Sequence, residues 1–313
     1  VHEILCHYSN SVGKVTDVWQ IGGIAVEKSA SVLANASNFR LSTSEGEFLL
    51  KRNLRPDLVA SLDKQLALQE WLKDRGVAIP QLVLTDSGAR HSDFQNEMWY
   101  LARFVPGNYF SGQDREIEAA GNEIGRLLAT LLDRPAELSL GRTRADYFTP
   151  LEHQTVAKTS DLRKNWNKVF GTDNATALEA GWAKAIDLFD ALSNETEFLN
   201  RFPRVTAHID LHPHNILMGH NALNAILDFD ACYEIPLELS VGFATCKLMK
   251  RVGTRLQGNS RLDETGRWTD RFLVAMEQHL PIISGSRKTL ELFAKAEVMR
   301  RLLSMCNCHI NGQ

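Results

Sequence analysis

The first third of the chain alternates short apolar stretches with polar turns, a pattern that predicts β-strands. The stretches Phe39–Leu41 and Glu47–Lys51 flank the polar residues Ser44–Gly46, and this arrangement is typical of a β-hairpin. Gln81–Thr85 and Trp99–Val105 predict two more strands, joined by a polar loop. We therefore expect four or five strands in this part of the chain.

One amphipathic helix is predicted between the hairpin and the later strands. Leu58, Leu62 and Leu66 recur at every fourth position and would lie on one helical face. Pro56–Asp57 suits the first turn of this helix, because proline is well tolerated there, and Gly76 suits its C-terminal end. We therefore expect one helix before residue 106.

After the Pro106–Gly107 junction the spacing of apolar residues is mainly helical. Three groups of apolar residues form stripes that would face a core: Ile117, Ile124, Leu127, Leu128 and Leu131; Trp182, Ile186 and Phe189; and Phe293, Ala296, Met299 and Leu303. Within this half Ala225–Phe229 is typical of a strand. The pattern predicts an α+β protein with a small β-rich lobe at 1–105 and a larger helical lobe at 106–313.

Size and composition agree with two globular lobes. The 313 residues exceed what one compact core usually holds, and 44% hydrophobic with 23% charged residues is typical of soluble proteins. The net charge of -3 gives no general attraction for nucleic acid. The apolar runs fall short of the ~20 residues that a membrane helix requires, and the first residues do not resemble a signal peptide. We expect a cytoplasmic protein with neither nucleic acid nor a membrane as partner.

The cysteines predict reduced thiols. They are scattered and odd in number, which fits a cytoplasmic protein better than a disulfide framework. Cys306 and Cys308 form a CxC pair beside His309, a possible metal site, but no second Cys/His pair follows at zinc-ligand spacing.

The segment His208–Leu217 carries the strongest chemical signal. It reads HIDLHPHNIL, and thirteen residues after Asn215 the triplet Asp228–Asp230 follows the apolar pair Ile226–Leu227. Phosphoryl transfer requires a carboxylate that orients the acceptor hydroxyl, and oxygen ligands that hold Mg²⁺ against the phosphates. An Asp, an Asn five residues later and a second Asp opening a DFx triplet after a strand match the arrangement of a kinase catalytic loop.

The two motifs together resemble the aminoglycoside phosphotransferase and choline kinase-like superfamily, which also contains bacterial thiamine, homoserine and hexosamine kinases. The resemblance implies a bilobal protein-kinase-like fold and a phosphotransferase that uses ATP and Mg²⁺ on a small-molecule hydroxyl. It implies that Asp210 is the catalytic base and that Asn215 and Asp228 are metal ligands. His208 would be a structural member of the loop, and Asp230 stands where protein kinases have glycine.

Two residues of the β-rich lobe are predicted to contact the nucleotide phosphates. Lys51 ends the strand after the hairpin, where kinases have a lysine that a helix glutamate holds, and Gln65 or Glu70 would be its partner here. The loop Leu33–Asn38, which would cover the phosphates, has no glycine, although relatives often carry a glycine pair followed by an asparagine. Asn38 matches that asparagine. The missing glycines predict modest affinity for the nucleotide.

The end of the last predicted strand resembles a kinase hinge, the segment that offers backbone groups to adenine. A strand leading into a Pro-Gly turn has this form, and it makes Arg103, Phe104 and Val105 the predicted contacts of the base.

The acceptor is less clearly indicated. Between Lys250 and Arg301 basic residues outnumber acidic ones by 11 to 6. A site for polycationic aminoglycosides should be acidic, so this balance favours an acceptor that is neutral or bears a carboxylate or phosphate. The stretches NFRLSTSEGEFLLKR and MWYLARF resemble hexosamine-kinase-like members and give a slight preference for a sugar or amino sugar. Choline, homoserine, thiamine and aminoglycosides stay open, as does the oligomeric state.

Two other functions stay open as well. A catalytically silent, nucleotide-binding regulator would account for the glycine-free loop and the undecided partner of Lys51. A metal-dependent hydrolase would use His208, Asp210, His212 and His214 as ligands of zinc or iron, but it would leave Asn215 without a role.

Overall fold

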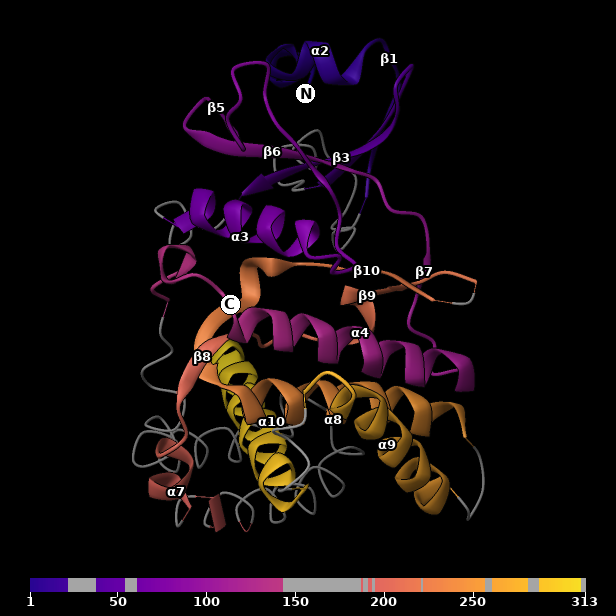
Figure 1. Ribbon diagram of the computed structural model, residues 1–313, viewed down its shortest axis with the longest axis vertical. Helices are drawn as coiled ribbons and strands as arrows, with labels where there is room; N and C mark the ends of the chain where they lie inside the picture. Colours follow the sequence, from indigo (N-terminus) through magenta and orange to yellow (C-terminus); the bar gives the residue numbers. More distant parts are fainter. Residues whose placement is uncertain are drawn as a thin grey trace.

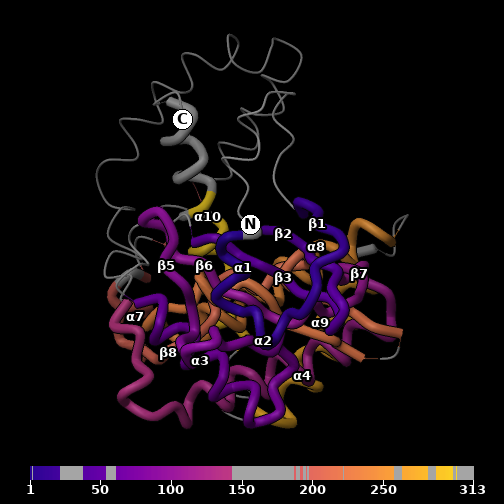
Figure 2. The backbone as a smooth tube through the Cα atoms, turned by 90° about the horizontal axis from the view of Figure 1, so that it is seen from above, coloured from indigo at the N-terminus to yellow at the C-terminus, as the bar shows by residue number. Residues whose placement is uncertain are grey.

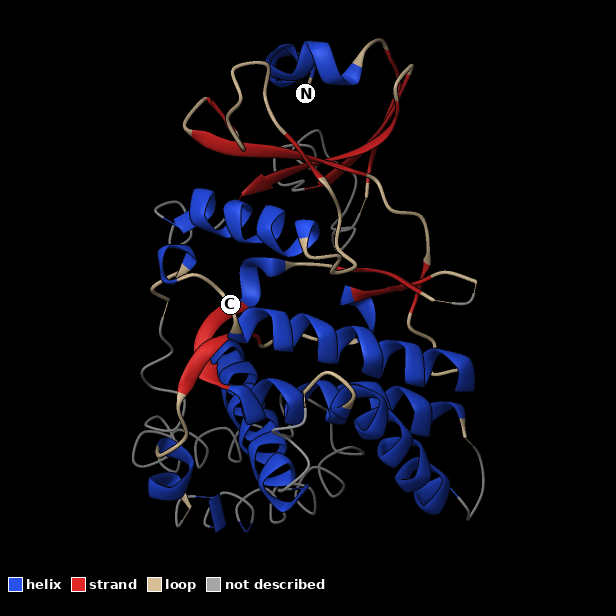
Figure 3. Ribbon diagram, viewed as in Figure 1, coloured by secondary structure: helices blue, strands red, loops and turns tan. Residues whose placement is uncertain are grey.

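A computed structural model describes residues 1–21, 38–53, 61–142, 187, 191–192, 195–220, 222–256, 261–280 and 287–310. The long strands lie in one part of the molecule and most helices in another (Figure 3). The predicted α+β class, with a β-rich N-terminal lobe and a helical C-terminal lobe, is confirmed. The lobe boundary at residues 105 and 106 stays a prediction.

An antiparallel sheet forms the N-terminal lobe. Its strand order is β1-β2-β3-β6-β4, and β5 pairs with β6 beside this path. Strands β2 and β3 form the predicted hairpin, in which Thr43 lies opposite Gly46. The bounds are β1 Val15–Gln20, β2 Asn38–Thr43, β3 Gly46–Asn53, β4 Leu82–Val83, β5 Ser92–Phe94 and β6 Glu97–Arg103.

Side chains alternate along a strand, so one face of this sheet packs in a core and the other faces a cleft. In β3, Phe48 and Leu50 are buried in a core that also contains Tyr8, whereas Leu49 and Lys51 line a cleft on the other face. Figure 1 shows α2 above the sheet and α3 below it. The α-helices described in this lobe are α1 His2–Leu5, α2 Ser9–Val12 and α3 Leu62–Asp74.

The prediction of four or five strands and one helix in this lobe was wrong, since the described residues contain six strands and three α-helices before residue 106. Strand β1 is almost entirely exposed, so no buried alternation marks it in the sequence. Helices α1 and α2 span only four residues each, too few for a helical period to be visible.

The predicted end of α3 at Gly76 is confirmed. This glycine has a φ of +76°, a conformation that costs other residues energy, and its N–H donates to the carbonyl of Lys73. The next N–H, of Val77, reaches back to Leu72, which completes a Schellman motif. The predicted start of the helix at Pro56–Asp57 lies outside the described residues.

Long helices build the C-terminal lobe around a common core. Helix α4 packs on α9, and α8 packs on both α9 and α10. Figure 2 looks down through the N-terminal strands onto α8 and α9, which shows that the two lobes are stacked. The bounds are α4 Asp114–Leu132, α7 Thr196–Asn200, α8 Leu237–Arg255, α9 Arg261–Glu277 and α10 Arg287–Ile310.

Two of the predicted apolar stripes can be compared with the structure. All five apolar residues of the α4 stripe are buried, and so are Phe293 and Ala296 of α10. The side chains of Met299 and Leu303, and the stripe Trp182–Phe189 as a whole, lie outside what the structure describes.

Two small sheets complete this lobe and carry the motif residues. Strands β7, β9 and β10 form one, and β8 pairs with β11 in the other. The strand predicted at Ala225–Phe229 is observed as β10, which begins and ends earlier. The bounds are β7 Asn108–Tyr109, β8 Arg204–His208, β9 Ile216–Met218, β10 Leu223–Ile226 and β11 Cys232–Pro236.

The described residues contain no helix that is both long and apolar enough to cross a bilayer. Cys6, Cys232 and Cys246 are free thiols, as predicted, while the side chains of Cys306 and Cys308 lie outside the description.

The contact between α4 and α9 depends on small residues, and we expect Gly125→Ala to lower the free energy of unfolding by about 1–3 kcal/mol. A Cβ at this position would lie 2.6 Å from the carbonyl oxygen of Met276, which would force the two helices apart. Urea unfolding measures the change.

Gly266→Ala is the matched control, because a Cβ there meets nothing within 4 Å. On this exposed position of α9 alanine should raise the free energy of unfolding by about 0.5–1 kcal/mol through its helix propensity. Equal effects of the two substitutions would contradict a close approach of α4 and α9.

Candidate active site

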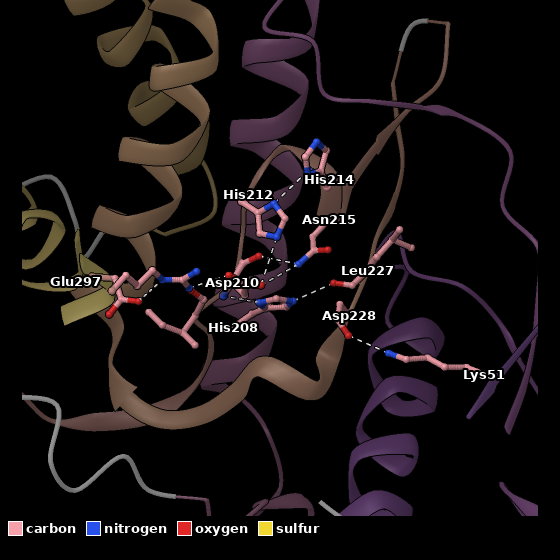
Figure 4. A network of polar contacts seen from close by, with 11 residues as sticks. Lys51, His208, Asp210, His212, His214, Asn215, Leu227, Asp228 and Glu297 are labelled. Atoms are coloured by element: carbon pink, nitrogen blue, oxygen red, sulfur yellow. Dashed lines mark hydrogen bonds and ion pairs between the residues drawn. The ribbon is translucent and has the colours of Figure 1, made fainter. Parts of the chain in front are cut away.

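Two loops that carry the motif residues lie side by side because the strands next to them pair. Strand β8 leads into the loop that contains Asp210, and β11 follows the loop that contains Asp228. The two strands are antiparallel, with His208 opposite Cys232, so the pairing holds the two loops next to each other. Figure 4 shows the resulting cluster, with Asp210 near its centre and Asp228 toward Lys51.

His208 connects the two loops from inside the core. Its Nε2 lies 3.0 Å from the carbonyl oxygen of Leu227, and its Nδ1 lies 3.1 Å from the backbone N of Asp210. Burial lowers the pKa of His208, so a neutral ring with its proton on Nε2 satisfies both contacts. Ser240, at the start of α8, donates its hydroxyl to the carbonyl of His208 at 2.6 Å. Both ring nitrogens of His208 are therefore used to hold the backbones of the two loops together, and neither is free to bind a ligand.

Asp210 is surrounded by groups that stabilise its charge. Its Oδ1 lies 2.7 Å from Nη2 of Arg301, and its Oδ2 lies 3.3 Å from Nε2 of His212. Burial alone would raise the pKa of Asp210, but hydrogen bonds and charge from His212 and Arg301 outweigh it and hold the pKa well below its usual value. The carboxylate is thus ionised, oriented and only weakly basic.

The ion pair between Asp210 and Arg301 was not predicted from the sequence. Arg301 lies on α10, stacks over the ring of Phe243 at 4.1 Å and also pairs with Glu297, which is fully buried. The only available signal was a Glu and an Arg at positions i and i+4 beside the apolar residues Phe293 and Ala296. Such pairs are common on helices, so the spacing alone did not indicate a site.

Asn215 is tied to Asp210 through its side-chain amide. Its Nδ2 donates to the backbone carbonyl of Asp210 at 2.9 Å, and the backbone carbonyl of Asn215 accepts from the N–H of Leu227 at 2.9 Å. Because the amide nitrogen is used in this way, the amide oxygen is the atom available to a cation. Asn215 and Asp228 both line the same cleft.

Asp228 adopts a left-handed backbone conformation with φ of +64° and ψ of +59°. For a residue other than glycine this conformation is uncommon and is often found at functional sites. Its side chain is 42% exposed and contacts Nζ of Lys51 at 2.9 Å through one oxygen. Asn215 and Asp228 together offer one amide and one carboxylate oxygen donor, a set that suits Mg²⁺ when phosphate oxygens complete the coordination.

Lys51 is held by Asp230 as well as by Asp228. Nζ of Lys51 lies 3.2 Å from Oδ2 of Asp230, whose Oδ1 accepts from Gln65 at 2.7 Å. Burial alone would lower the pKa of Lys51, but Tyr100 and the two carboxylates outweigh it and raise the pKa well above its usual value. Both oxygens of Asp230 accept hydrogen bonds, one from Lys51 and one from Gln65, so this carboxylate anchors Lys51.

Neither candidate partner from the helix contacts Lys51. Gln65 reaches it only through Asp230, and Arg142 in turn donates to Gln65 at 2.9 Å. Glu70 pairs instead with Arg90 at 2.5 Å. The expectation of a helix partner is thus corrected: Asp230, at the position where protein kinases have glycine, supplies the charge that a helix glutamate would otherwise provide.

The predicted phosphate contacts lie together in a cleft of about 440 Å³ between the lobes. Asn38, Lys51 and Tyr100 are cross-strand neighbours on β2, β3 and β6, and all three line the cleft. The loop before Asn38 lies outside the described residues, so its lack of glycine has no structural outcome here.

The residues of the predicted hinge do not line this cleft. Tyr100 and Ala102 are the residues of β6 that line the cleft, whereas Arg103, Phe104 and Val105 are not among the lining residues. The N–H of Arg103 donates to Gln81, and that of Phe104 to Glu47. Both N–H groups are therefore committed within the lobe, and adenine recognition by this segment stays a prediction.

A second cavity of about 570 Å³ adjoins this cleft. Tyr109 and His214 line both cavities, and their rings contact edge to face with centroids 5.2 Å apart. His212 and Arg301, which contact Asp210, line the second cavity. Two residues that contact Asp210 thus line the second cavity, although Asp210 itself is a lining residue of neither cavity.

The hydrolase hypothesis finds no support in this geometry. Among the described residues no three His, Cys, Asp or Glu side chains come together as a metal-binding group. Both ring nitrogens of His208 contact backbone atoms, and Nδ1 of His212 lies 3.3 Å from the backbone N of His214.

Comparisons with known proteins agree with these observations. A family model described as "Phosphotransferase enzyme family" (APH) matches residues 29–238. A curated homoserine kinase from Bradyrhizobium sp. (strain ORS 278) is 24% identical over 225 residues, which cover 69% of this chain and 62% of that protein. The matched region is thus less than two thirds of the relative's length.

Solved structures confirm the bilobal kinase-like fold. Amicoumacin kinase hAmiN, solved in complex with AMP-PNP, Ca²⁺ and Ami, has a TM-score of 0.68 at 13% identity, covering 98% of this chain and 86% of that one. Choline kinase LicA from Streptococcus pneumoniae has a TM-score of 0.58 at 14% identity, covering 100% and 92%. At these identities the likeness concerns the fold.

We expect Arg301→Gln to lower the free energy of unfolding by about 2–4 kcal/mol, because the fully buried Glu297 and the half-buried Asp210 both lose its charge. Adding Glu297→Gln should recover about 1 kcal/mol or more, since one buried charge is then removed. Thermal or urea unfolding of the single and double variants measures both effects.

Arg201→Gln is the control, because Arg201 and Glu197 have the same i, i+4 spacing but are 69% and 86% exposed. Its effect should stay within about 0.5 kcal/mol. A similar loss for Arg201→Gln and Arg301→Gln would contradict the importance of burial.

Proposed function

Because the chain belongs to the phosphotransferase enzyme family, we propose that it transfers the γ-phosphoryl group of Mg-ATP to a hydroxyl group of a small molecule. One observation carries this proposal. Asn215 joins the two halves of the site, since its amide contacts Asp210 while its side chain lines the cleft shared with Lys51 and Asp228. A carboxylate for the acceptor and ligands for metal and phosphate are thus in contact with each other.

In this proposal Asp210 acts on the acceptor. Its Oδ2, which has only the longer contacts at 3.3 and 3.4 Å, accepts a hydrogen bond from the acceptor hydroxyl and orients the oxygen toward the γ-phosphorus. The oxygen–phosphorus bond forms as the bond from the γ-phosphorus to the bridging oxygen of ADP breaks, and the hydroxyl proton passes to Asp210. In a loose transition state the proton leaves late, so a weakly basic carboxylate suffices.

Asn215, Asp228 and Lys51 act on the nucleotide. Asn215 and Asp228 would hold Mg²⁺, which neutralises charge on the phosphates when bound. Lys51 would then exchange Asp228 for phosphate oxygens, while Asp230 and Gln65 keep it in place. Asn38, beside Lys51 in the sheet, would add a contact from the N-terminal lobe.

Two lines of support exist for the acceptor. The sequence stretches named above favour a sugar or amino sugar, whereas curated relatives that are 24–28% identical are named homoserine kinase. L-Homoserine and amino sugars are therefore the first acceptors to test, followed by choline, thiamine and aminoglycosides.

We expect Asp210→Asn to lower acceptor-dependent turnover by about 10²–10⁴-fold and to leave ATP affinity nearly unchanged, because the amide keeps the shape but accepts no proton. ADP release measures turnover, and calorimetry measures ATP binding. Asp74→Asn, an exposed position on α3, is the matched control and should behave as the parent protein.

Full turnover of Asp210→Asn would contradict its assignment as the base. Normal ATP binding without ADP release on any acceptor would favour the silent regulator over the kinase.

Asp228 and Asp230 should respond differently to the same substitution. Asp228→Asn is expected to raise the Mg²⁺ concentration for half-maximal rate by about 10-fold or more, because it removes a charged metal ligand. Asp230→Asn is expected to raise the KM for ATP without that shift, because it loosens Lys51. Rates titrated with Mg²⁺ and with ATP distinguish the two, and an equal Mg²⁺ shift in both variants would contradict the separate roles.

A further inference from the structure

The second cavity is lined by positive charges from one face of α8. Lys247, Lys250, Arg251 and Thr254 have the spacing i, i+3, i+4 and i+7, which places them on one helical face, and all four line the cavity. Arg301 adds a further cation, but Asp210 and Glu297 already balance its charge. The other three cations, Lys247, Lys250 and Arg251, have no such partner in the cavity, because its described lining residues include neither Asp nor Glu.

Lys247, Lys250 and Arg251 can be compared with another cation of the same helix. Arg255, on the same helix but outside the cavity, pairs with Asp114. Among the described residues no ion pair joins Lys247, Lys250 or Arg251 to an Asp or Glu; Lys247 lies instead over the ring of Phe243 at 5.4 Å. Within the described part of the chain, positive charge therefore gathers in the cavity without a carboxylate beside it.

Such an arrangement opposes stability. Like charges at i and i+4, here Lys247 and Arg251, destabilise a helix slightly, and a third cation at Lys250 adds to the repulsion. The low-dielectric walls of a cavity also focus the resulting positive electrostatic potential. An anion in the cavity would remove the repulsion and gain charge-assisted hydrogen bonds.

The cavity is also placed correctly for an acceptor. His212 and Arg301 line it and contact Asp210, so a ligand held there can turn a hydroxyl toward that carboxylate. Tyr109 and His214 separate it from the nucleotide cleft, across which the phosphoryl group would move.

We propose that the phosphoryl acceptor carries an anionic group, a carboxylate or a phosphate, which Lys247, Lys250 and Arg251 bind while its hydroxyl faces Asp210. This inference rests on the proposed function and narrows its substrate class. It disfavours polycationic aminoglycosides, which the same charges would repel, and uncharged sugars, which would leave the cations unbalanced. A hydroxy acid, a hydroxy amino acid or a sugar phosphate meets the requirement.

Matched pairs of acceptors test the role of the charge. ADP release with Mg-ATP is measured for L-homoserine against L-homoserinol, D-glycerate against glycerol, and glucosamine 6-phosphate against glucosamine, with kanamycin as a polycation. We expect kcat/KM about 10- to 100-fold higher for the anionic member of the pair whose shape fits, mainly through KM. The first two pairs detect a carboxylate, and the third detects a phosphate.

Variants of the α8 face test the residues. Lys250→Gln combined with Arg251→Gln should lower kcat/KM for the anionic acceptor by about 10- to 100-fold and remove the preference within the pair. Arg255→Gln removes one charge from the same helix outside the cavity and is the matched control. Arg251→Glu should shift the preference toward the uncharged member.

Calorimetry without ATP separates this inference from the proposed function. Tighter binding of the anionic member, lost in the double variant, would support the anion site even if no acceptor released ADP, an outcome that would contradict the kinase alone. Equal binding and equal turnover within all three pairs, or preferential turnover of kanamycin, would overturn the anion site and leave the kinase standing.

Discussion

The buried imidazole of His208 is the constraint on which the site depends. It contacts the backbone of Asp210 on one loop and of Leu227 on the other, and the β8–β11 pairing places it between them. Burial lowers the pKa of the ring and keeps it neutral, so these contacts do not require a charge to be buried in the core. The spacing between Asp210 and the loop that carries Asp228 is therefore set by core packing rather than by surface loops.

Each charged group of the site is held by a partner from a distant part of the chain. Arg301 of α10 holds Asp210, and Asp230 holds Lys51 from the opposite lobe. Gln65 of α3 supports Asp230, so the place of a helix carboxylate is taken by an amide and a loop carboxylate. These contacts fix side-chain positions before any substrate binds, which reduces the reorganisation needed during transfer. Lys247, Lys250 and Arg251 of α8 line the second cavity with no Asp or Glu among its described lining residues, and this is the basis of the proposed anion site.

Local patterns predicted the elements whose stabilisation is local. The β2–β3 hairpin, the end of α3 at Gly76 and the buried stripe of α4 were visible because alternation, a left-handed glycine and helical spacing act over a few residues. Strand β1 and the single-turn helices α1 and α2 were missed, because their places depend on packing against strands far along the chain. The hydrogen bonds that engage the N–H groups of Arg103 and Phe104 in the predicted hinge were likewise not visible in the sequence, because they come from residues far along the chain.

The sequence by itself determined the family, the α+β class and the chemical types at the site, since the order and spacing of Asp210, Asn215 and Asp228 lie within one short segment. Only the tertiary structure decided the partners of these residues and the charge of the second cavity. Arg301 and Asp210 are 91 positions apart, and Lys51 and Asp230 are 179 apart. Contacts over such separations arise from how helices and sheets pack, and no local spacing encodes them.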